Sequence, residues 1–142
     1  MHLSAHMLVP SVSRYMTAKP ITIARTATLA EAHRTMRAHG IRHLPVIDEA
    51  GNLCGEVSQR DLHLIETLSD VDLETVRVEE AMVERPFIVT GDTALEEVVE
   101  IMGEHKYGSA IVMGRDGVEG IFTAVDACNV LAELLHEEAV PT

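Results

Sequence analysis

The strongest constraint on the fold of this chain is that its second half repeats its first. Subtracting 66 from the later residue numbers aligns the two halves, and after a one-residue deletion the offset becomes 65. The alignment pairs Met16 with Met82, Pro20 with Pro86, Leu29 with Leu95, Glu31 with Glu97, Met36 with Met102, His39 with His105, Val46 with Val112 and Gly51 with Gly117. A repeat of this kind predicts two related structural units, each of roughly fifty residues.

The clearest part of the repeat is a short segment near the end of each half, which we call the closing corner. Its two copies are Gly-Glu-Val-Ser-Gln-Arg-Asp at residues 55–61 and Gly-Ile-Phe-Thr-Ala-Val-Asp at residues 120–126. Each copy predicts a short strand that ends at a hydroxyl residue, Ser58 or Thr123, which caps the helix that follows. The aspartate, Asp61 or Asp126, then lies in the first turn of that helix.

Two interpretations of the closing corners are open. An aspartate at such a corner can accept two hydrogen bonds from the vicinal diol of a ribose, and a helix N-terminus favours a nearby phosphate. The same pattern of a hydroxyl residue followed three residues later by an acid also caps helices that bind no ligand. The first interpretation predicts a nucleotide site, and the second predicts only a stable helix start.

Hydrophobic periodicity and turn residues predict the same order of elements in both halves. In the first half we expect a short helix at 11–16, a strand at 21–23, a helix at 29–39 capped by Thr28 and ended by Gly40, strands at 44–48 and 53–57, and a helix from Asp61 to 68. Residues 69–77 form a polar linker with a helical turn at 71–76. In the second half we expect a short helix at 78–82, a strand at 87–90, a helix at 93–106, strands at 109–113 and 118–122, and a final helix at 123–136.

Composition and charge exclude several classes of protein. The 142 residues are 46% hydrophobic but only 3% aromatic, so the core consists of aliphatic side chains and Met. No apolar run is long enough to span a membrane, and the start of the chain does not resemble a signal peptide, so we expect a cytoplasmic protein. The net charge of -12 argues against a nucleic-acid partner. Residues 1–61 carry a charge of +2 and residues 62–142 carry -14, so a small anion is favoured by the first half.

The chain resembles the paired CBS domains that form a Bateman module. The resemblance covers about residues 8–138 and includes a Met-Thr-x-x-Pro-like opening at Met16, Thr17 and Pro20 and at Met82 and Pro86. It implies an α/β fold of two pseudo-symmetric β-α-β-β-α CBS motifs packed sheet to sheet, since one such unit leaves a sheet face uncovered. The expected segments are an N-terminal lead at 1–10, CBS motif 1 at 11–68, a linker at 69–77, CBS motif 2 at 78–138 and a tail at 139–142.

The resemblance also implies clefts that bind adenosine-containing ligands such as AMP, ADP, ATP or S-adenosylmethionine, with no cofactor required. In such modules the closing corner of one half holds the ribose, and the other half encloses the adenine. Carried over to this chain, one site combines Thr123 and Asp126 with Thr17, Thr22 and Ile41. The other site combines Ser58, Arg60 and Asp61 with Val83, Ile88 and Tyr107.

Phosphate recognition is expected from basic residues near the cleft. The family pattern points to Arg42, His43 and Arg60, and Lys106 is a further candidate. Arginine suits phosphate because its planar fork can donate two hydrogen bonds at once. The second half has Gly108, Ser109 and Val125 where the first half has Arg42, His43 and Arg60, so we expect the two sites to be unequal.

Other chemistries lack their residues. His39 and His43 lie on either side of Gly40, with no cysteine or second histidine pair at ligand spacing, so no metal site is expected. There is no GxSxG, no P-loop and no HExxH, so we do not expect an enzyme. The leading hypothesis is a regulatory module that acts on an unknown partner and forms a homodimer through exposed leucines of the last helix, Leu131, Leu134 and Leu135. The alternative is a ligand-free structural or dimerisation module.

Overall fold

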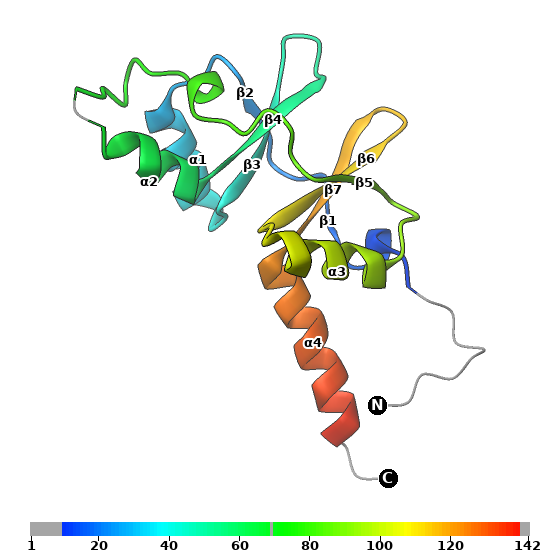
Figure 1. Ribbon diagram of the computed structural model, residues 1–142. Coiled ribbons are helices and arrows are strands. Elements are labelled where there is room, and N and C mark those ends of the chain that lie inside the picture. Colours follow the sequence, from blue (N-terminus) through cyan, green and yellow to red (C-terminus); the bar gives the residue numbers. More distant parts are fainter. Residues whose placement is uncertain (1–9, 69, 140–142) are drawn as a thin grey trace. The chain divides into compact units, whose positions relative to one another are not determined.

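The computed structural model describes residues 10–68 and 70–139, which form two compact units (Figure 1). The described part of unit 1 contains residues 10–18, 87–114 and 119–139, and that of unit 2 contains residues 19–68, 70–86 and 115–118. Both units have a β-α-β-β-α order, so the prediction of a mixed α/β fold with two such motifs is confirmed. Residues 1–9 of the expected N-terminal lead and residues 140–142 of the expected tail lie outside the described residues.

Unit 2 contains a three-stranded sheet covered by two helices. Its elements are β2 (Ile23–Ala24), α1 (Leu29–His39), β3 (His43–Ile47), β4 (Leu53–Ser58), α2 (Gln59–Glu66) and a short 3-10 helix, η2 (Val78–Glu80). The strand order is β2-β3-β4, with β2 parallel to β3 and β3 antiparallel to β4. The middle strand β3 has buried residues at both faces, because Leu44, Pro45 and Val46 are all buried.

Helix α1 has the predicted bounds because both of its ends carry strong signals. The Thr28 hydroxyl accepts a hydrogen bond from the Glu31 N–H at 3.1 Å, and the Glu31 carboxylate accepts one from the Thr28 N–H at 3.2 Å. Gly40 ends the helix in the left-handed region, with a φ of 63°. Glycine takes this conformation without the steric penalty that other residues meet there.

The segment that follows α2 is packed against the unit 2 core. Val71, Leu73 and Val76 contact the buried cluster of this unit. The Leu29 N–H donates to the Val76 carbonyl at 2.9 Å, and the Ala30 N–H donates to the Leu73 carbonyl at 2.9 Å. The expected helical turn is a single hydrogen-bonded turn, in which Thr75 and Val76 donate to the Asp72 carbonyl. This segment therefore supplies acceptors for the first N–H groups of α1, which have no partner within the helix.

Unit 1 has the same plan with one more strand. Its elements are η1 (Val12–Arg14), β1 (Thr17–Ala18), β5 (Ile88–Thr90), α3 (Leu95–His105), β6 (Ser109–Gly114), β7 (Gly117–Thr123) and α4 (Ala124–Ala139). The strand order is β1-β7-β6-β5, with β5 parallel to β6 and β1 antiparallel to β7. Its core is formed by Val12, Val89, Leu95, Val98, Met102, Ala110, Val112 and Phe122.

The two compact units do not coincide with the two sequence repeats, because the opening segments are exchanged. The Val12 N–H, from the first half, donates to the Thr93 carbonyl of the second half at 2.8 Å. The Val78 N–H, from the second half, donates to the Ala27 carbonyl of the first half at 2.7 Å. Each unit is therefore completed by about ten residues of the other repeat. The sequence boundaries at 11–68 and 78–138 remain a prediction about the repeats.

A few elements differ from the sequence prediction. The two-residue strand β1 was not expected, and β2 begins at Ile23 instead of Ile21. Both strands are defined by pairing with residues far away in the sequence, which local patterns do not reveal. Helix α4 extends to Ala139, beyond the expected end at His136.

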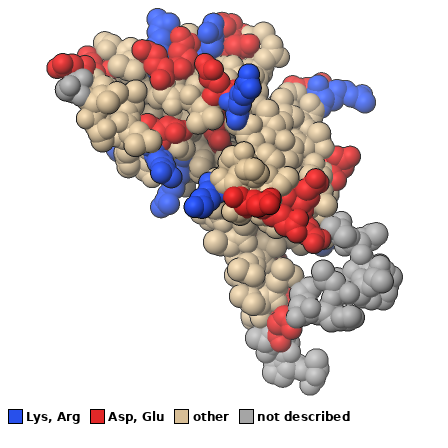
Figure 2. All heavy atoms as spheres, in the orientation of Figure 1, with Lys and Arg blue, Asp and Glu red and all other residues tan. Residues whose placement is uncertain are grey.

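The surface of unit 1 is acidic on one helix and apolar on another. Figure 2 shows acidic side chains gathered over α3, where the exposed acids are Glu96, Glu97, Glu100 and Glu104. Helix α4 instead exposes large apolar side chains, with Val125 and Leu135 each 60% and Leu131 55% exposed.

Within residues 10–68 and 70–139, none of the helices has the length and apolar content needed to cross a membrane.

Candidate functional site

The closing corner of unit 2 lies where β4 passes directly into α2. The Asp61 N–H donates to the Ser58 hydroxyl oxygen at 3.1 Å. The Ser58 N–H donates to the Asp61 carboxylate at 2.8 Å, through the Oδ2 atom. These reciprocal bonds form a capping box, which satisfies two backbone donors at the start of the helix. The predicted cap and the predicted position of the aspartate are both present.

The closing corner of unit 1 repeats this geometry between β7 and α4. The Thr123 N–H donates to Asp126 Oδ2 at 2.9 Å, and the Asp126 N–H donates to Thr123 Oγ1 at 3.2 Å. The Thr123 hydroxyl also donates to Asp126 Oδ2 at 3.2 Å. The two corners therefore share one backbone arrangement although five of their seven residues differ in type.

The capping role leaves both carboxylates able to bind a ligand. In each corner the aspartate accepts its hydrogen bonds through Oδ2, and within the described residues Oδ1 has no hydrogen-bond partner. Asp61 and Asp126 are only partly buried, so solvent reaches them. An ionised carboxylate can accept hydrogen bonds at about four positions. The capping and ribose-binding interpretations are thus compatible.

Beside each corner lies the opening segment of the other repeat. In unit 2 the Glu56 N–H donates to the Val83 carbonyl at 3.0 Å, and the Val83 N–H donates to the Glu56 carbonyl at 2.8 Å. In unit 1, Thr17 occupies the matching position, paired with Ile121. The structure therefore brings Val83 close to the Ser58 corner and Thr17 close to the Thr123 corner.

This close approach explains the glycine at the start of each corner. A Cβ atom on Gly55 would lie 2.7 Å from the Val83 carbonyl oxygen and 2.6 Å from the Met82 sulfur. A Cβ atom on Gly120 would lie 3.0 Å from the Thr17 carbonyl oxygen. Neither glycine has a positive φ, so the requirement is for space and not for backbone conformation.

The remaining residues expected to contact the adenine are distributed over both units. Unit 2 contains Thr22, half-buried before β2, and Ile41, half-buried between α1 and β3. Unit 1 contains Ile88, 47% exposed, and Tyr107, 42% exposed. The Tyr107 ring stacks on Phe87 and on His105, with 5.2 Å between ring centroids in both pairs. Each predicted site combines residues of both units, and these combinations remain predictions.

The basic residues expected to bind phosphate have different surroundings. Arg42, Arg60 and Lys106 are exposed, and in the described part of the chain none of them forms an ion pair. Lys106 ends α3 in the left-handed region, with a φ of 60°, at the position that Gly40 occupies in the first half. These three side chains are available to a ligand.

His43 differs because it is largely buried at the start of β3. Burial lowers the pKa of its imidazole, and the nearby Arg42 adds to this effect while Asp61 opposes it. Its Nδ1 atom is buried without a hydrogen-bond partner and lies 3.7 Å from a carboxylate oxygen of Glu56, which is too long for a hydrogen bond. At neutral pH His43 therefore offers a phosphate a polar contact but little positive charge.

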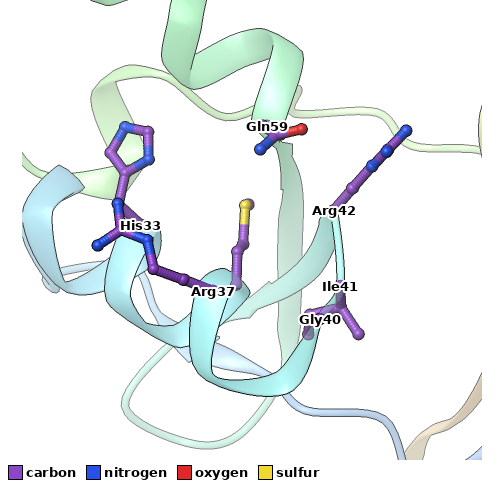
Figure 3. Close-up of a pocket in the computed structure, with 7 residues that line it drawn as sticks. His33, Arg37, Gly40, Ile41, Arg42 and Gln59 are labelled. Carbon is purple, nitrogen blue, oxygen red and sulfur yellow. The ribbon is translucent and has the colours of Figure 1, made fainter.

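A shallow pocket of about 300 Å³ opens in unit 2 beside the closing corner (Figure 3). It is lined by His33, Met36, Arg37, Gly40, Ile41, Arg42 and Gln59. Ile41 and Arg42 were expected at a ligand site, whereas His33, Arg37 and Gln59 were not. One signal could have identified His33 and Arg37: residues 32–47 contain three arginines, three histidines and no acid, in a chain with a net charge of -12.

Comparison with protein families identifies both repeats. The model of the CBS domain matches residues 12–64 and 78–133. Inosine-5'-monophosphate dehydrogenase of Haemophilus influenzae is 27% identical over 109 residues, which cover 76% of this chain but only 22% of that enzyme. A CBS domain-containing protein of Dictyostelium discoideum is 29% identical over 140 residues and matches 92% of this chain and 95% of its own length. The chain thus spans about a fifth of the enzyme's length but nearly all of the smaller relative.

Solved structures with the same fold include proteins with bound adenosine compounds. The AcuB protein of Vibrio cholerae is 36% identical, with a TM-score of 0.81 and coverage of 94% of this chain and 100% of its own. The CBS domain pair of protein MJ0100, in complex with 5'-methylthioadenosine and S-adenosyl-L-methionine, is 22% identical, with a TM-score of 0.79 and coverage of 89% and 99%. CBSX2 in complex with AMP is 24% identical, with a TM-score of 0.73 and coverage of 88% and 98%.

Proposed function

Because this chain belongs to the CBS domain family and carries two copies of the domain in tandem, we propose that it is a regulatory module that binds an adenine nucleotide and acts on a partner protein. The observation that carries the proposal is the closing corner, in which a partly buried aspartate keeps one carboxylate oxygen available next to a helix N-terminus. A ribose diol and a phosphate are the groups that such a corner recognises.

Two solved proteins of the same fold contain adenosine compounds, and they support a ligand of that class for this chain. Their names state complexes with AMP in one case and with S-adenosylmethionine in another, and adenosine is common to both. We propose the ribose contacts for Asp61 and Asp126, with Ser58 and Thr123 beside them. Thr17, Thr22, Ile41, Val83, Ile88 and Tyr107 are proposed to enclose the adenine. AMP, ADP, ATP and S-adenosylmethionine are the candidate ligands.

The two corners are proposed to bind with different affinity. Arg60 follows the corner of unit 2, whereas the exposed Val125 occupies the matching position in unit 1. A side chain with five N–H donors can hold a phosphate, and valine has none. A ligand with phosphate groups should therefore prefer the corner that contains Arg60, together with Arg42 or Lys106.

Regulation requires that the ligand favours one arrangement of the protein over another. A ligand shifts such an equilibrium only by its difference in affinity for the two states. We propose a cytoplasmic homodimer in which nucleotide occupancy changes the surface that a partner protein meets. We propose that the module regulates another protein and does not itself catalyse a reaction. Regulation is the common role of CBS domains.

A second candidate function has one observation in its favour. The exposed apolar side chains of α4, led by Leu131 and Leu135, fit a dimerisation module whose corners only cap helices. In that case no nucleotide binds, and the Asp61 and Asp126 carboxylates serve only the helix starts.

Thermal unfolding of the ligand-stripped protein separates the two functions. AMP, ADP, ATP, S-adenosylmethionine, NAD and GTP are each added at about millimolar concentration. A ligand at 100 times its dissociation constant adds about 2.7 kcal/mol, which raises the midpoint by about 5–10 °C for a chain of this size. Asp61→Ala should reduce that shift for a ligand bound at the corner of unit 2, and Asp126→Ala should reduce it for a ligand bound at the corner of unit 1.

Glu31→Ala is the matched control. Glu31 completes the capping box of α1, so its loss removes the same kind of helix cap at a place where no ligand is expected. All three variants should lower stability by about 1 kcal/mol, but only the aspartate variants should lower nucleotide binding. If no adenine compound raises the midpoint, the sensor function is wrong and the dimerisation module is favoured.

A further inference from the structure

The first long helix of each unit occupies an equivalent position, but the two helices carry opposite charge. Helices α1 and α3 both have 11 residues, and their bounds differ by the repeat offset of 66. With histidine neutral, α1 has two arginines and one glutamate, Glu31, for a charge of +1. Helix α3 has four glutamates and no lysine or arginine, for a charge of -4. Since both helices have the same role in the fold, the fold does not require this difference in charge.

The charges lie on the solvent faces of the two helices. The buried positions that the two helices share are Leu29, Ala32 and Met36 in α1 and Leu95, Val98 and Met102 in α3. With 3.6 residues per turn, the middle of the opposite face is at Arg34 in α1 and at Glu100 in α3. These two exposed residues occupy the same position of the repeat. The other exposed glutamates of α3 lie around Glu100, and Figure 2 shows them as one acidic patch.

Ion pairs within the described residues do not neutralise either set of charges. Arg37 forms no ion pair there, and the Arg34 guanidinium lies 3.9 Å from a carboxylate oxygen of Glu74. An exposed pair at this distance contributes little to stability, so Arg34 can exchange it for another acid. In the same part of the chain, none of the four α3 glutamates pairs with a cation. Each helix therefore presents charge that a partner of opposite sign can neutralise.

The second helix of each unit adds exposed apolar side chains. Helix α2 contacts α1 and exposes Leu64, and α4 exposes Leu131 and Leu135. The two acids of α2 are partly buried and already engaged, Asp61 in its helix cap and Glu66 with a histidine of α1. Exposed apolar side chains with polar ones around them are typical of surfaces that bind other proteins.

Each unit thus has one outward helical face with its own charge. The acidic face of unit 1 consists of Glu96, Glu97, Glu100, Glu104, Leu131 and Leu135. The basic face of unit 2 consists of Arg34, Arg37 and Leu64. The two faces are complementary in charge, and both offer leucine side chains for apolar contact.

We propose that copies of this chain associate through unlike faces, with the acidic face of one copy against the basic face of another. The proposal rests on the proposed function only in requiring self-association, and it does not depend on nucleotide binding. Contact between two acidic faces would bring the glutamates of both α3 helices together without a cation, and such like-charge contacts suppress the wrong pairing. A two-fold axis forms the unlike contact twice in a closed dimer, and without that axis the contact repeats along an open assembly. The same faces meet in both cases.

Sedimentation equilibrium of the full chain without nucleotide measures this association as a dissociation constant. Arg34→Glu and Glu100→Arg should each weaken the association about tenfold or more, because each places like charges across the contact. The double variant, with both changes in one chain, should return to within about threefold of the original constant, because both sides of the contact are reversed. Arg34 and Glu100 are exposed, so the circular dichroism spectra should be unchanged.

Asp116→Arg is the matched control for the change in charge. Asp116 is an exposed acid in the turn between β6 and β7, outside both faces. Its replacement makes the same charge change as Glu100→Arg, and it should alter the dissociation constant about twofold or less. Salt gives a second readout. Raising the salt from about 0.1 M to about 1 M shortens the Debye length from about 10 Å to about 3 Å, so it should weaken contact between unlike faces and strengthen contact between like faces.

The charge variants separate this proposal from the proposed function. The proposal is wrong if the single variants associate as tightly as the original chain, if the double variant stays as weak as the single variants, or if salt strengthens the association. A monomeric chain also overturns it, together with the proposed homodimer. Nucleotide binding is measured independently by the thermal shift with adenine compounds, so its failure would leave the pairing of unlike faces intact.

Discussion

The glycine that begins each closing corner gives the sharpest prediction about stability. Replacing Gly55 with alanine places a Cβ atom 2.6 Å from the Met82 sulfur and 2.7 Å from the Val83 carbonyl oxygen. The Met82 side chain can rotate away, but the Val83 oxygen belongs to the backbone. That oxygen accepts the Glu56 N–H at 3.0 Å, so the chain must move and strain this bridge.

The size of the effect follows from three contributions. Overpacking of this kind destabilises a protein by about 1–3 kcal/mol. Weakening the two hydrogen bonds between Glu56 and Val83 adds up to about 1 kcal/mol each. Alanine also restricts the unfolded chain, which offsets about 0.4–1 kcal/mol. We therefore expect Gly55→Ala to lower the free energy of unfolding by about 2 kcal/mol, and the midpoint by about 4–8 °C.

Gly103→Ala is the control for this experiment. Gly103 lies inside α3, and a Cβ atom there would meet nothing within 4 Å. The same substitution should stabilise the protein by about 0.5–1 kcal/mol, because alanine favours the helix. Thermal and urea unfolding measure both variants. If Gly55→Ala is as stable as the original protein, the close approach of the opening segment does not explain the glycine.

Two further predictions concern single residues of the two halves. Lys106→Gly should raise stability by about 1 kcal/mol in urea unfolding, because glycine takes the left-handed conformation of this position without the steric penalty that lysine meets, as Gly40 does at the end of α1. An unchanged urea midpoint would contradict this. Burial lowers the pKa of His43, so the unfolded chain binds its proton more readily, and the free energy of unfolding should fall as pH drops below about 6.5. His43→Gln should flatten this dependence between pH 7.5 and 5.5. Equal slopes for the variant and the original protein would show that burial does not lower the pKa of His43.

The elements of this fold were predictable where their signals are local. Helix α1 begins after Thr28 and ends before Gly40 because a capping box and a left-handed glycine act within a few residues of the chain. The strands β3 and β4 were found for a similar reason, since apolar runs flank a turn around Gly51. By contrast, β1 consists of Thr17 and Ala18 alone, and only its pairing with β7 makes it a strand.

In the candidate site, too, the residues with a local sequence signal were predictable and the others were not. The closing corners were identified because Ser58 with Asp61 and Thr123 with Asp126 are separated by a fixed three residues. The pocket was missed in part because Gln59 and Arg37 are distant in sequence, with the strands β3 and β4 between them. The pairing of His43 with Ser58 and the backbone bond from Gln59 to Arg42 place the start of α2 beside the start of β3.

The sequence by itself determined that the chain has two related halves, where most helices and strands lie, and which aspartates stand at a helix start. These features depend on residue spacing along one segment, and such spacing can be read from a linear chain. The tertiary structure decided which segments complete each unit. It showed that residues 10–18 pack with the second repeat and 78–86 with the first, that Gly55 must be small because Val83 lies against it, and that Arg37 and Gln59 share a pocket. Such contacts join residues tens of positions apart, and they form only when a whole core is buried.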